Sequence, residues 1–314
     1  MVLIVLSTYN GAAYLREFLH SLQQQSYCEW RLLIRDDGSQ DATLDIVKDF
    51  FSDHLEQLCI IPSHHNVGVR ESFNRLVEAA LQMPECEYVM FADQDDVWKP
   101  DKIAQTLNLM RHLELRHTAV PLLVHTDLHV CDADLNSIDP SLWHYEKNDP
   151  NKCTLGYLLY QNTATGCSMM VNKSLLEQAF PVPEGAIMHD WWCSMVAAVF
   201  GASDFTAEAT LYYRQHSSNT IGAKEHKPYD IFKKTANMLL WRNAPYLEHL
   251  EPNRKQAYAF LEYFDDVLTP HHKELLHFFC NMEQYSWFQK RRQSIRFQCL
   301  RQGWIQNISL LLRV

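Results

Sequence analysis

Glycine is scarce in this sequence, with nine glycines among 314 residues. That scarcity excludes collagen-like and glycine-rich linker architectures. Neither G-x-x-x-x-G-K-[ST] nor, near the N-terminus, G-x-G-x-x-G occurs, so the classical phosphate-loop and dinucleotide-binding interpretations are weak. The apolar run Val2–Leu6 has no basic segment before it and is too short for a signal peptide or a membrane span. It suits a buried β-strand.

Closely spaced cysteines are missing as well. The nine cysteines lie far apart and include no C-x-x-C pair, so the sequence predicts neither a zinc ribbon nor a disulfide scaffold. We expect reduced, mostly buried thiols in a cytoplasmic protein. Hydrophobic residues make up 47% and aromatic residues 12%, which is enough for a large core and excludes global disorder.

The charge balance is acidic and uneven. There are 28 Lys and Arg residues against 38 Asp and Glu residues, a net charge of −10 that disfavours nonspecific nucleic-acid binding. Residues 286–314 contain six basic residues and no acidic one, which leaves −16 for the first 285. This tail predicts a basic amphipathic helix. Such a helix either lies on the anionic cytoplasmic face of an inner membrane or packs against the body or a second subunit.

The first hundred residues alternate strand and helix signals. Continuous apolar runs, typical of parallel strands covered on both faces, occur at Val2–Leu6, Trp30–Ile34, Leu58–Ile61 and Tyr88–Ala92. Apolar residues recur at helical spacing between them. The order β-α-β-α-β-α-β predicts an α/β fold with a parallel, doubly wound sheet.

The second part of the chain is mixed. After Pro100 the pattern predicts a helix to about Arg116, strands at Leu122–Val130, Thr163–Val171 and Thr210–Arg214, and helices near Leu155–Leu159 and from His189 to Phe200. Beyond Lys224 it is helical to the end. No Gly/Ser linker divides the first part, so we expect one domain at 1–222, with halves 1–100 and 101–222, and a helical extension at 223–314.

Polar motifs follow the predicted strands where each ends. They are Ser7–Asn10, Asp36-Asp37, His64–Asn66 and Asp93–Asp96. In an open parallel sheet, ligands bind beyond the carboxyl ends of the strands. Each loop alone is explained by turn chemistry, but four loops that converge on one edge predict a site.

The acidic loop after the fourth strand needs a partner. Asp93, Asp95 and Asp96 place three carboxylates within four residues, and they repel one another. A helix N-terminus can offset one charge. Hard divalent cations with oxygen ligands are the natural partners of the others.

These motifs together resemble a known family. The segments are Leu6–Gly11, Arg35–Asp41, Asn66–Gly68 and Phe91–Trp98, followed by Thr165–Cys167, His189–Trp192 and Tyr213–His216. In this order they resemble a family 2 glycosyltransferase with the GT-A fold, over about residues 1–222. The form Asp-Gln-Asp-Asp-Val-Trp is similar to the rhamnosyltransferase-like branch, which assembles bacterial O-antigen, capsule or other surface polysaccharide.

The resemblance implies a nucleotide-sugar donor site. Tyr9 would pack on the pyrimidine, Ser7 and Thr8 would line its pocket, and Asp37 would accept a hydrogen bond from the base N3–H of uracil or thymine. The full set of implied donor contacts is Ser7, Thr8, Tyr9, Asn10, Asp37, Asn66, Arg70, Asp93 and Gln94. Many members carry an arginine on the helix after the Asn-x-Gly turn. Phe73 stands near that place here, and Arg70 is the candidate to reach the phosphates instead.

The resemblance also implies a metal site and a catalytic base. Asp93 would face the ribose and the metal, Asp95 would bind Mg²⁺ or Mn²⁺ directly with Asp96 as the alternative, and His216 would complete the site. A packed or surface histidine is the plain alternative for His216. Asp190 is the candidate base, because partial burial beside tryptophans raises a carboxyl pKa; capping its helix is the plain alternative. The tryptophans Trp98, Trp191 and Trp192 are either core residues or a platform for a sugar.

The expected function is therefore that of an inverting, metal-dependent glycosyltransferase. The donor would be a dTDP- or UDP-sugar, with dTDP-L-rhamnose favoured and UDP-glucose, UDP-galactose or an N-acetylhexosamine as alternatives. The acceptor would be a glycan, lipid-linked, in surface polysaccharide synthesis. A nucleotidyltransferase would show a glycine-rich N-terminal loop, which is absent. A non-catalytic nucleotide-sugar-binding protein is the alternative from a different class, and it would not need Asp190.

Overall fold

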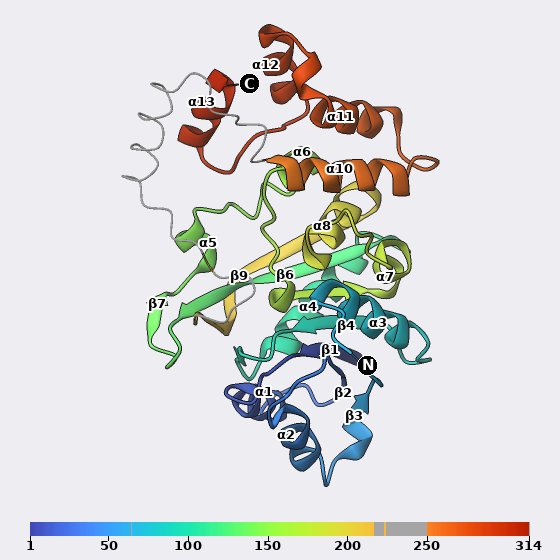
Figure 1. Cartoon of the computed structure of the whole chain (residues 1–314), viewed down its shortest axis with the longest axis vertical. Coiled ribbons are helices and arrows are strands. Elements are labelled where there is room, and N and C mark those ends of the chain that lie inside the picture. Colours follow the sequence, from blue (N-terminus) through green and yellow to red (C-terminus); the bar gives the residue numbers. More distant parts are fainter. Residues whose placement is uncertain (64, 217–222, 224–249, 314) are drawn as a thin grey trace.

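The chain forms an α/β fold around one mixed sheet. The computed structural model describes residues 1–63, 65–216, 223 and 250–313. In that part, nine strands form a sheet whose main path is β3-β2-β1-β4-β8-β6-β9-β5, with β7 paired to β6. Figure 1 shows helices on both sides of this sheet and a group of helices stacked at one end. The predicted α/β class is confirmed.

The first four strands are parallel neighbours, as the sequence predicts. Their order is β3-β2-β1-β4, with connecting helices α1, α2 and α3. The bounds are β1 Val2–Thr8, α1 Leu15–Gln23, β2 Trp30–Asp36, α2 Thr43–Phe50, the 3₁₀ turn Leu55–Gln57, β3 Leu58–Ile60, α3 Val69–Leu81 and β4 Tyr88–Ala92. Successive residues of β1 face opposite sides: Leu3 and Val5 pack with α3, whereas Ile4 and Leu6 pack with α1 and α4. Burial on both sides explains why the run has no polar alternation.

The second half departs from a fully parallel sheet. It contains β5 Val97–Trp98, α4 Lys102–Glu114, β6 Leu122–Cys131, β7 Ser137–Asp139, α5 Leu142–Glu146, α6 Leu155–Leu158, the 3₁₀ turn Gly166–Ser168, β8 Met169–Asn172, α7 Lys173–Ala179, α8 His189–Phe200 and β9 Ala202–Arg214. Strand β8 lies antiparallel between β4 and β6, while β6 and β9 are parallel. The doubly wound parallel arrangement therefore holds for the first half, and the second half is mixed.

Two predicted strands have different bounds. The strand expected at Thr163–Val171 begins only at Met169, because Gly166–Ser168 forms a 3₁₀ turn first. The last strand begins at Ala202 rather than Thr210. Its first half is polar and partly exposed, so it lacks the apolar run that marks a buried strand.

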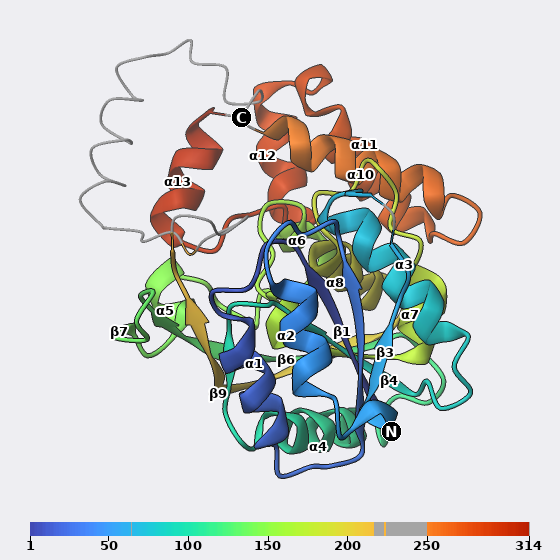
Figure 2. The same cartoon turned by 60° about the horizontal axis from the view of Figure 1, so that its bottom comes forward.

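The C-terminal helices share the core of the sheet. They are α10 Glu251–Tyr263, α11 Pro270–Cys280, the 3₁₀ turn Met282–Gln284, α12 Trp287–Arg296 and α13 Trp304–Arg313. Figures 1 and 2 show α10 and α11 next to each other, and Figure 1 shows α10 beside α8 with α11 on the far side of α10. Phe260 of α10 packs against Trp192 of α8, with ring centroids 5.1 Å apart, and both belong to the cluster that contains Leu3 and Val5. These helices are therefore part of the folded body.

Some expectations lie outside the described residues. The proposed domain boundary falls where only residue 223 is described. Of the region expected to be helical from Lys224 to the end, residues 224–249 are not described, and residues 251–313 contain α10, α11, α12 and α13. All nine cysteines are free, and six of them are buried, as expected. Among the described helices, none is both long and apolar enough to cross a membrane.

Phe260→Ala tests whether the C-terminal helices share the core. The buried ring is lost and a cavity is left beside Trp192, so the free energy of unfolding is expected to fall by about 3–5 kcal/mol. Tyr258→Ala, on the same helix but 40% exposed, is the control and should cost less than about 1 kcal/mol. Urea unfolding of the full chain measures both. Equal, small losses would show that α10 contributes little to the common core.

Candidate active site

The loops that follow β1, β2 and β4 meet at one edge of the sheet. The register pairs Thr8 with Asp36 and Leu6 with Ala92, so all three strands end at nearly the same level. The strand order places β1 between β2 and β4. The predicted convergence of the polar motifs therefore has a simple cause, which is the parallel register of these three strands.

The loop after β1 is fastened to the loop after β4. The Tyr9 amide donates to Gln94 Oε1 at 3.0 Å, and Gln94 Nε2 donates to the Tyr9 carbonyl at 3.0 Å. Gln94 fills the space beside Gly11, where a Cβ would lie 2.2 Å from Gln94 Oε1. Asn10 has a positive φ of 48°, and its amide donates to Ser39 Oγ. The Tyr9 side chain remains 50% exposed above this scaffold.

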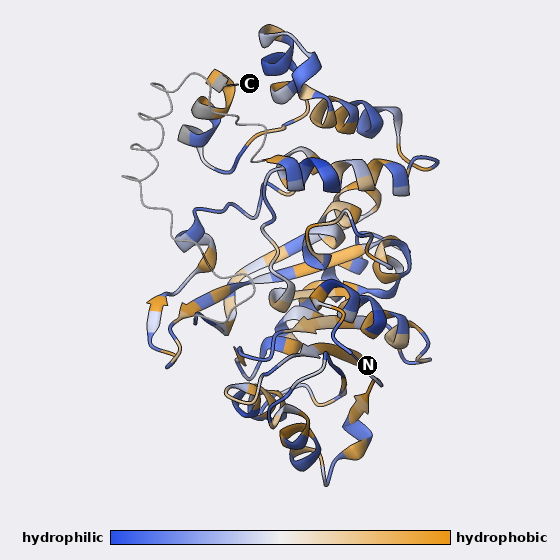
Figure 3. Cartoon of the chain, viewed as in Figure 1, coloured by the Kyte–Doolittle hydropathy of each residue, from blue (hydrophilic) through white to orange (hydrophobic). Residues whose placement is uncertain are grey.

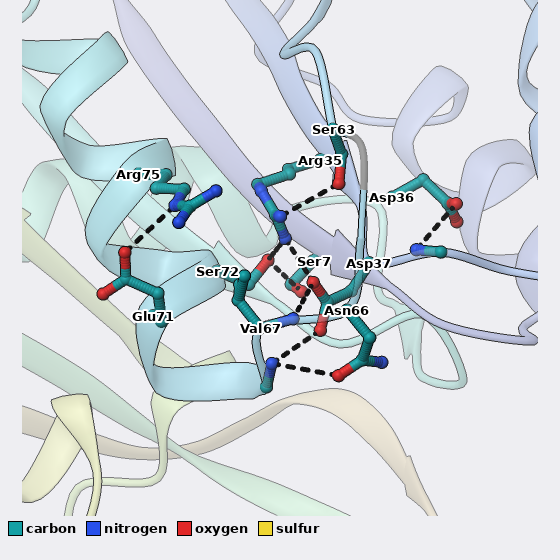
Figure 4. Close-up of polar contacts among 12 residues, drawn as sticks. Ser7, Arg35, Asp36, Asp37, Ser63, Asn66, Val67, Glu71, Ser72 and Arg75 are labelled. Atoms are coloured by element: carbon teal, nitrogen blue, oxygen red, sulfur yellow. Dashed lines mark hydrogen bonds and ion pairs between the residues drawn. The ribbon is translucent and has the colours of Figure 1, made fainter.

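The two aspartates that end β2 have different surroundings. Asp36 accepts from the hydroxyl of Thr8 and from the amides of Gly38 and Ser39, which is the turn chemistry expected of such a loop. Asp37 accepts from Arg35 and from the amides of Val67 and Gly68 (Figure 4). Asp37 is only 3% exposed. The amide of Gly68 also donates to Asn66 Oδ1, so the predicted Asn66 shapes this turn.

The acidic loop after β4 is crowded and partly buried. Burial, followed by the nearby charges of Asp95 and Asp190, raises the pKa of Asp93 to about 7. Burial and its neighbours Asp93 and Asp95 raise the pKa of Asp96 well above its usual range. Ligand atoms of Asp93, Asp96 and Cys167 lie within 4.8 Å of one another. Burial also raises the pKa of the Cys167 thiol, so the thiol keeps its proton and is a poor ligand.

Asp96 is the more enclosed of the two candidate metal ligands. Its side chain has no exposed surface, Oδ1 accepts from the Arg214 amide at 3.3 Å, and Oδ2 has no hydrogen-bond partner in the described part of the chain. Lys102, also fully buried, lies close enough for the charges to interact, and burial lowers its pKa to about 8. The acidic loop therefore contains a buried carboxyl group, that of Asp96, which lies near the buried amine of Lys102.

Asp95 meets the distant histidine that the sequence singled out. His216 Nε2 lies 2.8 Å from Asp95 Oδ2, and both side chains keep some exposure. The His216 ring stacks on Tyr14, with centroids 4.7 Å apart. Arg214, just before it, donates from Nε to the Asp95 carbonyl and pairs with Glu17. The end of β9 therefore carries His216 to the acidic loop. The carboxylate oxygens here suit a hard divalent cation, and the imidazole suits a first-row transition-metal ion.

Asp190 lies in the first turn of α8. Its carboxylate accepts from the Gly166 amide at 3.1 Å and from the Trp191 amide at 2.6 Å. The N-cap residue is Met188, so Asp190 does not cap this helix from the N-cap position. Burial raises the pKa of Asp190 to about 6, in the direction that the sequence predicts. Gly166 and Cys167 form one turn, which links Asp190 to the acidic loop.

Several predicted residues take structural positions. Trp98 and Trp192 are buried, as their core interpretation predicts, and Trp192 Nε1 donates to the Ala179 carbonyl. Phe73 is also buried and packs against the His189 ring. Arg70 donates to the Glu184 carbonyl at 2.9 Å.

One residue was missed. Arg35 is a fully buried cation that pairs with Asp37. Its position inside an apolar strand is the sequence feature that could have indicated a buried carboxylate partner.

Comparison with known proteins shows the fold and a family match over the first part of the chain. Residues 3–127 match the model of glycosyl transferase family 2. The chain is 26% identical to the dTDP-rhamnosyl transferase RfbG of Shigella flexneri, over 69% of this chain and 74% of that protein. It is 32% identical to the putative teichuronic acid biosynthesis glycosyltransferase TuaG of Bacillus subtilis, over 35% of this chain and 42% of that protein.

Solved structures show the same fold. The first is TarS residues 1–349 of Staphylococcus aureus in complex with UDP-GlcNAc, with a TM-score of 0.53, 15% identity and 95% and 92% of the two chains covered. The second is the mannosyltransferase PcManGT of Pyrobaculum calidifontis with GDP-Man and Mn²⁺, with a TM-score of 0.51, 15% identity and 99% and 86% covered. The expected GT-A fold is thus confirmed. The match to glycosyl transferase family 2 covers residues 3–127, which lie in the first part of this fold.

Proposed function

We propose that the chain is an inverting glycosyltransferase that takes a sugar from a dTDP- or UDP-sugar, with dTDP-L-rhamnose favoured. The acceptor is a glycan, lipid-linked, in bacterial surface polysaccharide synthesis. Residues 1–100 form the donor half of a domain at 1–222, residues 101–222 form its acceptor half, and 223–314 form the helical extension. The names of RfbG and TuaG support the donor and the pathway class. UDP-hexose and UDP-N-acetylhexosamine remain alternative donors.

The observation that carries the proposal is the position of Asp190. Its carboxylate is fixed by the amides of Gly166 and Trp191, lies near the acidic loop, and has a pKa of about 6. A base with this pKa is ionised at neutral pH and still basic enough to accept a proton in the transition state. Asp190 takes the proton of the acceptor hydroxyl, whose oxygen attacks the anomeric carbon from the side opposite the leaving diphosphate. That displacement inverts the anomeric configuration.

A divalent cation, Mg²⁺ or Mn²⁺, is proposed to be held by Asp95 and His216, with Asp93 beside them. Asp95 is preferred to Asp96 because its carboxylate is partly exposed and touches His216, whereas Asp96 is enclosed. When bound, such an ion stabilises the charge that develops on a departing diphosphate. Ser7, Thr8, Tyr9, Asn10 and Gln94 are proposed to form the wall of the nucleotide site. Arg70 reaches the Glu184 carbonyl in this structure, so its proposed phosphate contact needs a different rotamer.

Asp190→Asn tests the base. The amide cannot accept the proton, so kcat is expected to fall by about 10²–10⁴-fold while donor affinity is unchanged. In the wild-type protein, kcat/KM should decrease as pH falls below about 6, because Asp190 becomes protonated. Release of nucleoside diphosphate gives the rate and titration calorimetry gives the affinity. A near wild-type rate for Asp190→Asn would show that another group is the base.

Asp95→Asn and His216→Gln test the cation site. Each removes a proposed ligand, so Mn²⁺ affinity should fall by at least about tenfold, and donor affinity should fall with it. Asp45→Asn, on the exposed surface of α2, is the charge-matched control and should change neither. Calorimetric titration of Mn²⁺ into the chelator-treated protein measures the effect. Unchanged Mn²⁺ binding in both site variants would remove Asp95 and His216 from the metal site.

A peripheral membrane contact through residues 286–314 is also proposed. Trp287 and Phe288 of α12 and Trp304 of α13 are 52%, 78% and 73% exposed. Basic residues accompany them, and Figure 3 shows that most of α12 is hydrophilic. On α13, Ile308 and Leu312 continue the exposed side that Trp304 begins, at helical spacing. Exposed aromatic rings among arginines suit the interface of an anionic bilayer.

The double variant Phe288→Ser with Trp304→Ser tests this contact. The wild-type chain is expected to sediment with vesicles that contain anionic lipid, and less so at high salt, because screening weakens the attraction. The double variant should remain in the supernatant. Leu115→Ser is the control: Leu115 is 83% exposed and follows α4, far from α12 and α13 in Figure 2. A wild-type chain that forms a dimer and does not bind vesicles would favour the alternative, in which the tail packs against a second subunit.

A further inference from the structure

Arg35 is a buried cation that lies where the loops after β2 and β3 meet the start of α3. Its side chain has no exposed surface. The guanidinium donates to Asp37 Oδ1 at 2.5 Å, Ser72 Oγ at 3.0 Å, Ser63 Oγ at 2.9 Å and the His65 carbonyl at 3.3 Å (Figure 4). These partners come from β2, from α3 and from the loop between β3 and α3. A guanidinium at this depth cannot touch a ligand, so any effect on binding passes through its partners.

Asp37 is the partner to which the family resemblance assigns recognition of the base. Its Oδ1 accepts from Arg35 and from the Val67 amide at 2.9 Å, and its Oδ2 accepts from the Gly68 amide at 2.8 Å. A carboxylate offers about four acceptor positions, so these three donors leave one, on Oδ2. The side chain is 4% exposed. Only a single hydrogen-bond donor can therefore reach it.

The same guanidinium fixes the walls around that acceptor. Ser7, at the end of β1, donates to Ser72 Oγ at 2.6 Å, and Ser72 accepts from Arg35. Ser63 and His65 bind the other terminal nitrogen of Arg35 and thereby hold the loop that leads to Gly68. Gly68 has φ = +83°, a conformation that turns its amide toward Asp37 at little cost. One arginine thus orders β1, β2 and α3 around Asp37.

We propose that Arg35 is the positioning residue that makes the donor site selective for bases with an imide N–H, uracil and thymine, through Asp37. This inference rests on the proposed function. An acceptor held in one place by a buried cation and two backbone amides attracts the N3–H of uracil or thymine. It repels the N3 lone pair of cytosine. Without Arg35, Asp37 keeps its two backbone donors but loses its counter-charge and its fixed orientation.

Arg35→Met is the central variant, and Arg31→Met is its matched control. Arg31 lies on the same strand and pairs with Glu85 at the surface, away from Asp37. Calorimetry on the full chain with Mn²⁺ gives the affinities for UDP, dTDP and CDP. The wild-type chain should prefer UDP and dTDP over CDP by about tenfold or more. Arg35→Met should lose about that factor for UDP and dTDP and little for CDP, whereas Arg31→Met should behave like the wild-type chain.

Two further variants keep the test valid if Arg35→Met folds poorly. Arg35→Lys keeps the charge, but one ammonium group cannot reach both Asp37 and the His65 loop, so UDP affinity should lie between those of the wild-type and Met forms. The double variant Arg35→Met with Asp37→Asn should bind UDP no more weakly than Asp37→Asn alone, within about twofold, because Arg35 acts through Asp37. At saturating donor, kcat of Arg35→Lys should stay near the wild-type value while the donor KM rises.

The outcomes separate this inference from the proposed function. A folded Arg35→Met or Arg35→Lys protein that still discriminates UDP from CDP like the wild-type chain would overturn the role of Arg35. So would strictly additive losses in the double variant. A wild-type chain that transfers sugar from a guanine or cytosine nucleotide would overturn the base assignment and leave glycosyl transfer intact. A chain that binds no nucleotide and releases no nucleoside diphosphate would contradict the proposed function itself.

Discussion

The repulsion among carboxyl groups at the carboxyl end of β4 is the constraint around which this site is organised. Asp93, Asp96 and Asp190 surround the Gly166–Cys167 turn, and burial raises the pKa of all three. Packing several desolvated acids together costs free energy of folding, which a sequence optimised for stability alone would avoid. Such a concentration of perturbed acids is typical of sites where a cation or a proton is handled. The unfavourable packing of these acids therefore indicates that this edge of the sheet has a chemical function.

The two halves of the domain contribute different parts to that edge. The first half, the proposed donor half, supplies loops fixed by side-chain hydrogen bonds, such as the pairing of Gln94 with the Tyr9 backbone. The second half supplies Asp190 from the start of α8 and His216 from just beyond β9. The antiparallel strand β8 lies between them and brings the Gly166–Cys167 turn to the acidic loop. The mixed sheet is thus what allows residues over a hundred positions apart to meet.

The sequence predicted the elements whose burial leaves an apolar pattern, and it failed where burial is partial. Strands β1 and β4 are covered on both sides and read as apolar runs, whereas the early part of β9 is polar and half-exposed and gave no such signal. The prediction that His216 lies beside Asp95 came from a family resemblance. Sequence spacing alone cannot show that residues so far apart are in contact. An arginine inside an apolar strand indicates a buried carboxylate partner, but the sequence does not show which of the neighbouring aspartates pairs with Arg35, because that depends on the folded backbone.

The scarcity of glycine agrees with the way in which the proposed donor pocket is built. Glycine-rich nucleotide sites bind with successive backbone amides, which need residues without a Cβ. Here the amides of Val67 and Gly68 are turned inward onto Asp37, and a side-chain network of Arg35, Ser72 and Ser7 supports them. A pocket of this kind presents side chains rather than amides to its ligand. If the proposed pocket binds a nucleotide, its selectivity depends on which acceptor positions the buried network leaves free, and a single buried arginine then acts on it through Asp37 without touching the nucleotide.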